Sequence, residues 1–153
     1  FKTISKKGFV QLEDGRYDLN LGEKLKDAKY EQHAYVFGIL WSDDKRNTEL
    51  ALSCYGPTRV FLNGDLLYKS AVPEEVNSSV RKVISATFQA GWNSFLLYCK
   101  KVPSGFGCIF GSNRNSLNPL DYMSPFSERL GQGGWIYSEA MDEDVFYKGN
   151  IPD

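Results

Sequence analysis

The amino-acid sequence predicts an all-β protein, an antiparallel β-sandwich that forms a single domain. Turn signals recur at short spacing, and the apolar runs between them are short, which is typical of sandwiches and barrels. Aromatic residues are abundant, with ten Phe, nine Tyr and three Trp, and aromatic residues favour strands. No long segment shows convincing helical periodicity. A chain of 153 residues is one-domain sized and long enough to bury a core.

The expected strands are the apolar or alternating runs between these turns. In chain order they cover residues 16–21, 33–41, 48–55, 58–62, 65–68, 80–88, 94–101, 106–110 and 135–138. The runs 33–41 and 94–101 are apolar at most positions, as in strands buried on both faces. Asn63-Gly64 separates two of the runs. This dipeptide predicts a tight hairpin, because both central residues of a type I′ turn need positive φ.

The charge balance, the lengths of the apolar runs and the two ends of the chain indicate which classes of protein to expect. Basic residues number 18 and acidic residues 19, which argues against a nucleic-acid binder, because such proteins usually carry a basic stripe. No apolar run approaches the roughly 20 residues of a membrane span. The chain starts at Phe1 without a signal-peptide pattern and ends on a loop-like sequence. We therefore expect residues 1–153 to be a domain excised from a larger multidomain protein.

Three cysteines are present, and none belongs to a Cys-x-x-Cys pair. Cys54 and Cys99 fall inside apolar runs, where cysteine behaves as a small hydrophobic residue, and Cys108 follows a glycine loop. One disulfide with a free thiol and three free thiols both remain open, so the count does not fix the redox compartment.

Several motifs follow one another in a recognisable order between residues 34 and 110. An apolar strand, a polar loop and a second strand fill residues 34–55. The sequence RVFLNGD at 59–65 contains an aromatic-Leu-Asn-Gly-acid hairpin, and FQAGWNSFLL at 88–97 places Gly-Trp-Asn at the entry to a long strand. A glycine-rich strand, GFGCIF, follows at 105–110. In these features residues 35–110, about half of the chain, resemble the galactose-binding-domain-like β-sandwich modules attached to many bacterial carbohydrate-active enzymes.

This resemblance implies a jelly-roll-type sandwich with a non-catalytic accessory role beside a glycoside hydrolase or polysaccharide lyase. It also implies that the motifs are structural: Asn63 and Gly64 make the hairpin, Trp92 packs over the core edge, and Asn93 ties down the loop backbone. Many such modules bind glycans, whereas others only pack against the enzyme that they accompany. A secreted or cell-surface bacterial protein is the expected setting.

The sequence offers no catalytic constellation. His33, the only histidine, opens an apolar strand and is expected to be structural. Zinc spacing, a nucleophile elbow and a P-loop are all absent from the sequence. Carboxylates adjoin each other at 43–44, 74–75 and 142–144, but sequence neighbours on loops are not evidence for two carboxyl groups facing each other across a glycosidic bond. We therefore expect a domain that is not itself an enzyme.

A structural calcium ion is the one cofactor that the sequence leaves open. Asp14, Asp18 and Asn20 are oxygen donors near an early turn, a region where sandwiches of this kind often hold calcium. Their spacing does not match an EF-hand loop.

Two clusters combine aromatic rings with planar hydrogen-bonding side chains, as a sugar site requires. The first follows the strand at 33–41 and comprises Trp41, Asp43, Asp44, Arg46 and Asn47. The second comprises Asn113, Arg114, Asn115, Asn118, Asp121 and Tyr122, with Trp135 beyond a glycine run. For each single residue, a structural role remains the alternative; Trp41 and Trp135 could both be core.

Four hypotheses follow for function. The first is a carbohydrate-binding module, with an oligo- or polysaccharide as its partner. The second is a structural sandwich that packs against a neighbouring domain of the same protein, which a large apolar surface patch would favour. A protein-binding, adhesin-like sandwich stays open, and an independent enzyme is disfavoured by the missing catalytic residues.

Overall fold

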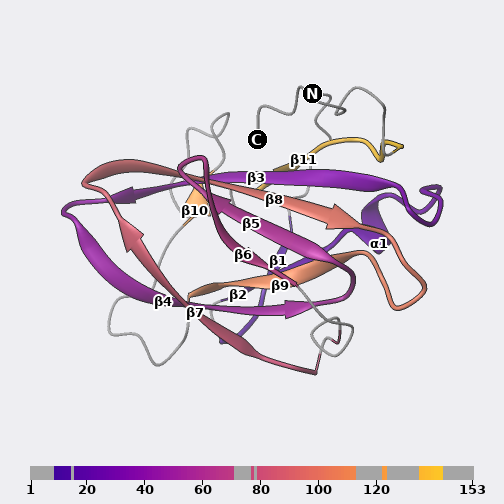
Figure 1. Cartoon of the computed structure of the whole chain (residues 1–153), viewed down its shortest axis with the longest axis horizontal. Helices are drawn as coiled ribbons and strands as arrows, with labels where there is room; N and C mark the ends of the chain where they lie inside the picture. The colour runs from indigo at the N-terminus through magenta and orange to yellow at the C-terminus, as the bar shows by residue number, and fades with distance from the viewer. Residues whose placement is uncertain are drawn as a thin grey trace.

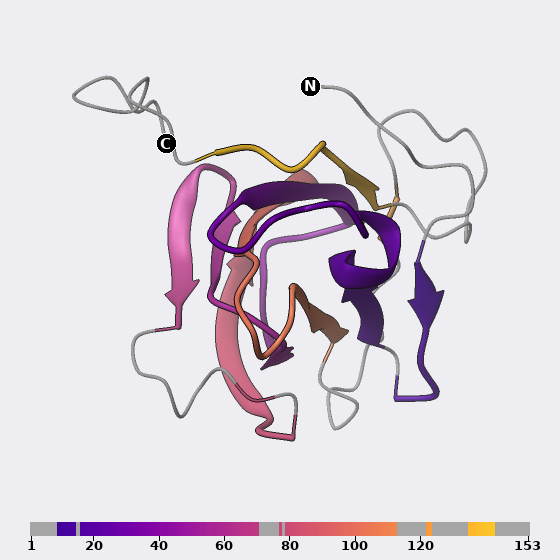
Figure 2. The same cartoon turned by 90° about the vertical axis from the view of Figure 1, so that its right-hand side faces the viewer.

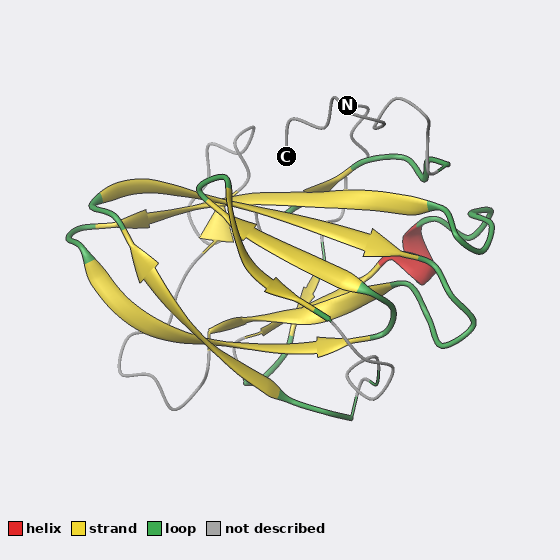
Figure 3. Cartoon of the chain, in the orientation of Figure 1, coloured by secondary structure: helices red, strands yellow, loops and turns green. Residues whose placement is uncertain are grey.

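The computed structural model describes residues 9–14, 16–70, 77, 79–112, 122–123 and 135–142. Its strands form two antiparallel sheets that lie face to face, as Figures 1 and 3 show. The predicted all-β sandwich is therefore confirmed. The jelly-roll connectivity stays a prediction. Within the described ranges, no helix is long and apolar enough to cross a membrane.

Counting the strands in the described ranges, the first sheet, sheet A, has five and the second, sheet B, has six. The order in sheet A is β1 (Val10–Gln11), β2 (Arg16–Asn20), β9 (Gly107–Ser112), β4 (Arg46–Cys54) and β7 (Lys82–Phe88). The order in sheet B is β10 (Tyr122–Met123), β3 (His33–Ser42), β8 (Gly91–Lys100), β5 (Thr58–Leu62) and β6 (Asp65–Lys69), and β11 (Ile136–Tyr137) also pairs with β3.

The core lies between the sheets and follows the two-residue alternation of the strands. Leu50, Leu52 and Cys54 of β4 point inward, as their spacing predicts, and all three are buried. The longest strands of sheet B, β3 and β8, supply a second set of buried side chains that includes Val36 and Phe95. Sequence therefore specifies the inner face of both sheets through simple alternation.

Trp135 is part of this core, and the prediction that it lines a ligand site is wrong. Its side chain is 1% exposed and packs against Phe95 and Phe110, with ring centroids 6.4 and 5.9 Å away. Gly38 makes room for it: a Cβ at that position would lie 2.8 Å from Trp135 Cε3. The large indole is thus accommodated by a missing side chain on β3.

The hairpin between β5 and β6 is the one that the sequence predicts. Asn63 and Gly64 have φ values of 51° and 88°, the positive values that a type I′ turn needs. Asn93 is buried at the start of β8 and binds the backbone of the preceding turn, as its resemblance-based role implies.

The chain differs from the prediction at the end of β2. Residue 21 does not continue the strand but opens a four-residue helix, α1 (Leu21–Lys24), drawn as an indigo coil in Figure 2. Asn20 caps this helix by accepting a hydrogen bond from Gly22 N at 3.0 Å. The backbone N–H groups of Leu21 and Gly22 donate to the Phe106 carbonyl. A capping residue and a long-range acceptor therefore outweigh the strand pattern. The two-residue strands β1 and β10 were also not predicted.

All three cysteines, Cys54, Cys99 and Cys108, are buried, and none of them forms a disulfide. Of the two arrangements that the sequence leaves open, the structure has three thiols.

Candidate functional site

Trp41 and Trp92 lie side by side on the surface at one end of sheet B. They are register partners on the adjacent strands β3 and β8, at the end away from α1 (left in Figure 1). Their side chains are 51% and 47% exposed, and their ring centroids are 5.1 Å apart with the planes at 76°. Two large aromatic faces are therefore available to solvent at one place.

The loop after β3 holds the Trp41 ring in position. Trp41 Nε1–H donates to Asp43 Oδ1 at 2.8 Å, and the Ser42 hydroxyl donates to the Asp44 carbonyl at 2.7 Å. Arg46 Nε donates to Asp44 Oδ1 at 3.1 Å. An exposed ion pair contributes at most about 1 kcal/mol to stability, so its main effect here is to order the loop. The structure thus brings together Trp41, Asp43, Asp44 and Arg46 of the first predicted cluster.

The turn between β7 and β8 fixes the backbone under Trp92. Gln89 Nε2 donates to the Trp92 carbonyl at 2.9 Å. Asn93 Nδ2 donates to the carbonyls of Gln89 and Gly91 at 2.9 and 3.1 Å. Trp92 is 47% exposed and meets Trp41 edge-on, and the packing role that the resemblance implies for it stays a prediction. The signal for its exposure was in the alternation: Phe95 points inward, so Trp92, an odd number of residues away, points outward.

The other predicted residues do not join this site. Asn47 accepts a hydrogen bond from the Thr87 hydroxyl on β7, at 2.7 Å. Of the second cluster, Asn113, Arg114, Asn115, Asn118 and Asp121 lie outside the described residues. Tyr122 is described only as backbone, in β10, where it pairs with Leu40.

The three candidate calcium ligands are bound to separate protein groups. Asp14 forms ion pairs with Arg16 at 2.7 Å and Arg81 at 3.1 Å. Asp18 accepts from the Tyr55 hydroxyl at 2.8 Å, and Asn20 caps α1. Across the described part of the chain, no three His, Cys, Asp or Glu side chains gather as a metal site would require. A structural calcium ion stays the open alternative to a domain without a cofactor.

His33 is buried among aromatic rings. It stacks on Tyr98 with ring centroids 4.9 Å apart and planes at 25°, and it meets Tyr35 edge-on. This environment agrees with the structural role predicted for it.

The outer face of sheet B is apolar over much of its width. Phe37, Leu96, Phe61 and Leu66 form one row across β3, β8, β5 and β6. The first three are half-buried, and Leu66 is 54% exposed. The strands β3 and β8 are therefore apolar on both faces, as predicted, but only the inner face is fully buried.

Comparison of the sequence with protein-family models and with curated proteins found no match.

Proposed function

We propose that this chain is a non-catalytic carbohydrate-binding module and that Trp41 and Trp92 form its sugar-binding platform. The observation that carries the proposal is the pair itself: two half-exposed indoles in contact, one of them held by a hydrogen bond to Asp43. Exposed aromatic side chains of this size normally require an explanation when they gather.

The geometry suits a sugar ring. The apolar CH face of a sugar packs on an aromatic ring, and its hydroxyl groups bond to planar polar side chains. With planes at 76°, the two indoles form two walls of a corner rather than one flat surface. Asp43 borders that corner through its hydrogen bond to Trp41, and Asp44 and Arg46 follow it in the chain and bind each other; together they offer acceptors and a donor for hydroxyl groups.

The wider setting is proposed from the resemblance alone. We place the chain among galactose-binding-like jelly-roll modules, as an accessory domain of a secreted or cell-surface bacterial enzyme that degrades glycans. A galactose-binding-like module would bring the glycan to the parent enzyme.

The test is a polysaccharide binding screen by affinity electrophoresis, run on the wild-type chain and on Trp41→Ala and Trp92→Ala. We expect at least one polysaccharide to retard the wild type and each tryptophan variant to lose most of that retardation. Tyr30→Ala is the matched control, because Tyr30 is an aromatic residue with 61% exposure outside sheet B. Retardation that persists in both tryptophan variants would place the sugar elsewhere and contradict the proposal.

A second candidate function is packing against a neighbouring domain. The row of Phe37, Leu96, Phe61 and Leu66 favours it, because such a face is suited to burial against another protein. Hydrogen exchange measured in a longer protein containing this chain would separate the candidates. Protection of β5 and β6 beyond that in the 153-residue chain would favour packing, and equal exchange would argue against it.

A further inference from the structure

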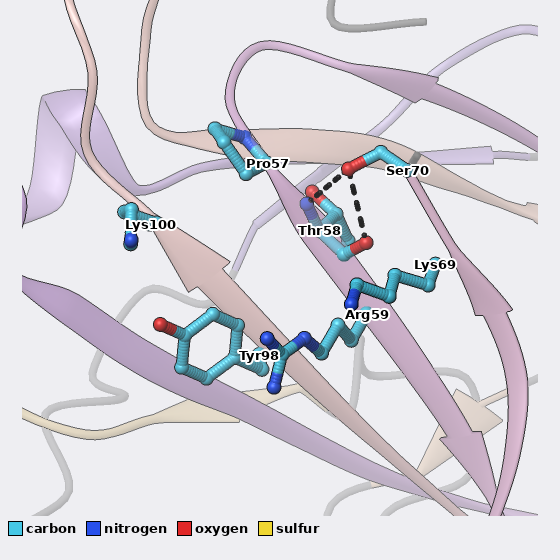
Figure 4. Close-up of a pocket in the computed structure, with 7 residues that line it drawn as sticks. All are labelled: Pro57, Thr58, Arg59, Lys69, Ser70, Tyr98 and Lys100. Carbon is cyan, nitrogen blue, oxygen red and sulfur yellow. Dashed lines mark hydrogen bonds between the residues drawn. The ribbon is translucent and has the colours of Figure 1, made fainter. Parts of the chain in front are cut away.

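A second concave feature lies at the other end of sheet B from the tryptophans. It is a pocket of about 270 Å³ between the ends of β5, β6 and β8, shown in Figure 4. Three of its lining side chains are cationic: Arg59, Lys69 and Lys100. None of the described residues that line it carries a carboxylate.

Arg59 is held in place by an aromatic ring rather than by an acid. Its guanidinium carbon lies 4.9 Å from the centroid of Tyr98, its register partner on β8. Tyr98 is buried and in turn stacks on His33. A stacked guanidinium keeps its N–H donors available in the plane of the group, where a carboxylate or sulfate can be bound by two hydrogen bonds.

The positive charge of the pocket is only partly compensated. Neither Arg59 nor Lys69 forms an ion pair with any carboxylate that the structure describes. Lys100 lies 3.7 Å from Glu31, whose side chain is 69% exposed. Arg59 and Lys69 line the same pocket and carry the same charge, so they repel each other, and a bound anion would relieve that repulsion.

The rim of the pocket is fixed by bonds between its own strands. Thr58 N donates to Ser70 Oγ at 3.0 Å, and Ser70 N donates to the Thr58 carbonyl at 3.0 Å. These bonds join the first residue of β5 to the chain just after β6, as the dashed lines in Figure 4 indicate for the Ser70 hydroxyl. Arg59 and Lys69 therefore project from two strands whose backbones are hydrogen-bonded to each other.

The pocket and the tryptophan pair share one face of the molecule. Trp92 and Tyr98 both point outward from β8 and are separated by six residues, which corresponds to about 20 Å along a strand. Ser94 and Leu96 lie between them on the same face. One oligosaccharide lying along β8 would therefore reach both ends.

We propose that the pocket is an acidic-sugar subsite, which binds a carboxylate or sulfate group carried by the glycan. The proposal rests on the carbohydrate-binding function proposed above. It defines the ligand class as an acidic polysaccharide, with Arg59 as the main group that binds the anion and Lys69 and Lys100 as supporting charges.

The experiment is a titration of the ¹⁵N-labelled chain followed by NMR. The probes are trigalacturonate, its fully methyl-esterified form and a sulfated galactose trisaccharide. We expect trigalacturonate or the sulfated sugar to shift the Arg59 Nε and Lys69 amide signals, together with the indole signals of Trp41 and Trp92. The neutral ester should shift the indoles alone. Which charged probe binds more tightly identifies the anion.

Variants then test the assignment. Arg59→Met should weaken trigalacturonate or sulfated-sugar binding by about tenfold, the loss of one charge-assisted contact. Lys26→Gln, which removes one exposed charge near α1, should leave the affinity unchanged. Higher salt should weaken binding of the charged probe more than binding of the ester.

The two proposals fail in different ways. Indole shifts with every probe and no change at Arg59 would overturn the acidic subsite and leave the sugar platform. Shifts at Arg59 that sodium acetate reproduces at the same concentration would also overturn it, because the pocket would then bind any anion. No shift at either end with any probe would overturn both.

Discussion

Asn63 and Asn93, thirty residues apart in the chain, bind each other side chain to side chain: Asn63 Nδ2 donates to Asn93 Oδ1 at 2.9 Å. Asn63 Oδ1 also accepts from the Ser94 backbone N–H at 2.8 Å. The β5–β6 hairpin is thereby fastened to the turn that precedes β8. The position of the backbone at Trp92 therefore depends on the turn of the β5–β6 hairpin.

Replacing Asn93 with alanine should destabilise the fold by about 2–3 kcal/mol. The substitution removes bonds to Asn63, Gln89 and Gly91, and it leaves the polar groups of this part-buried network without partners. Urea unfolding monitored by circular dichroism measures the change. Asn47→Ala removes an exposed side-chain pair and should change stability by no more than about 0.5 kcal/mol. Equal losses of unfolding free energy in the two variants would show that the hydrogen bonds of Asn93 stabilise the fold no more than an exposed side-chain pair does.

Gly38→Ala should also destabilise, against the usual trend. In an unobstructed strand, alanine is better than glycine by about 0.5–1 kcal/mol. Here the new Cβ would meet the buried Trp135 ring, and overpacking of this kind costs about 1–3 kcal/mol.

A double-mutant cycle with Trp135→Phe identifies the cause. If the indole is the obstacle, Gly38→Ala should cost at least about 0.5 kcal/mol less in the Trp135→Phe background than in the wild type. Strictly additive changes in the free energy of unfolding would assign the cost to the backbone instead.

The fold was predictable because alternation and turn chemistry act locally. The type I′ hairpin at Asn63-Gly64 and the inward face of β4 follow from the residues themselves. Helix α1 was missed because four residues are too few to show helical periodicity, and its acceptor, the Phe106 carbonyl, is far away in sequence.

The candidate site was only half predictable for a related reason. Trp41 carries its own polar loop, so the cluster around it was visible in sequence. Trp135 was assigned to a ligand site although it is part of the core, and Trp92 was left out of the candidate site although it is half-exposed. The inward and outward alternation along β8, counted from Phe95, predicts that Trp92 points outward. Trp135 follows a glycine run and precedes a two-residue strand, which is too short to show which of its positions point inward. The pocket at Arg59 depends on pairing between three strands, which no local pattern records.

The three thiols should be unreactive in the folded protein. Deep burial, with the thiol of Cys99 close by, raises the pKa of Cys108 well above its usual range, so little thiolate is available as nucleophile. At pH 8 we expect negligible reaction with Ellman's reagent in the native state and three equivalents in guanidinium chloride. Ser104→Cys, at an exposed position, should add one fast equivalent. A native thiol that reacts as fast as that control would mean that the core opens readily.

Asp14 should stabilise the fold at neutral pH and lose that effect in acid. Its partial burial works to raise the pKa, but the Arg16 backbone N–H and guanidinium, with Arg81, outweigh this and lower the pKa below its ordinary value. A carboxyl whose folded-state pKa is lowered stabilises the protein above its unfolded-state pKa of about 3.9, and the effect disappears as the pH falls through the folded-state pKa.

Asp14→Asn should therefore lower the free energy of unfolding by about 1 kcal/mol at pH 7. The gap from wild type should close as the pH is lowered from about 4 towards 2. Asp44→Asn, at a side chain that is 70% exposed, is the control and should show almost no gap at either pH. A gap for Asp14→Asn that is as large at pH 2.5 as at pH 7 would show that the carboxylate charge is not what matters.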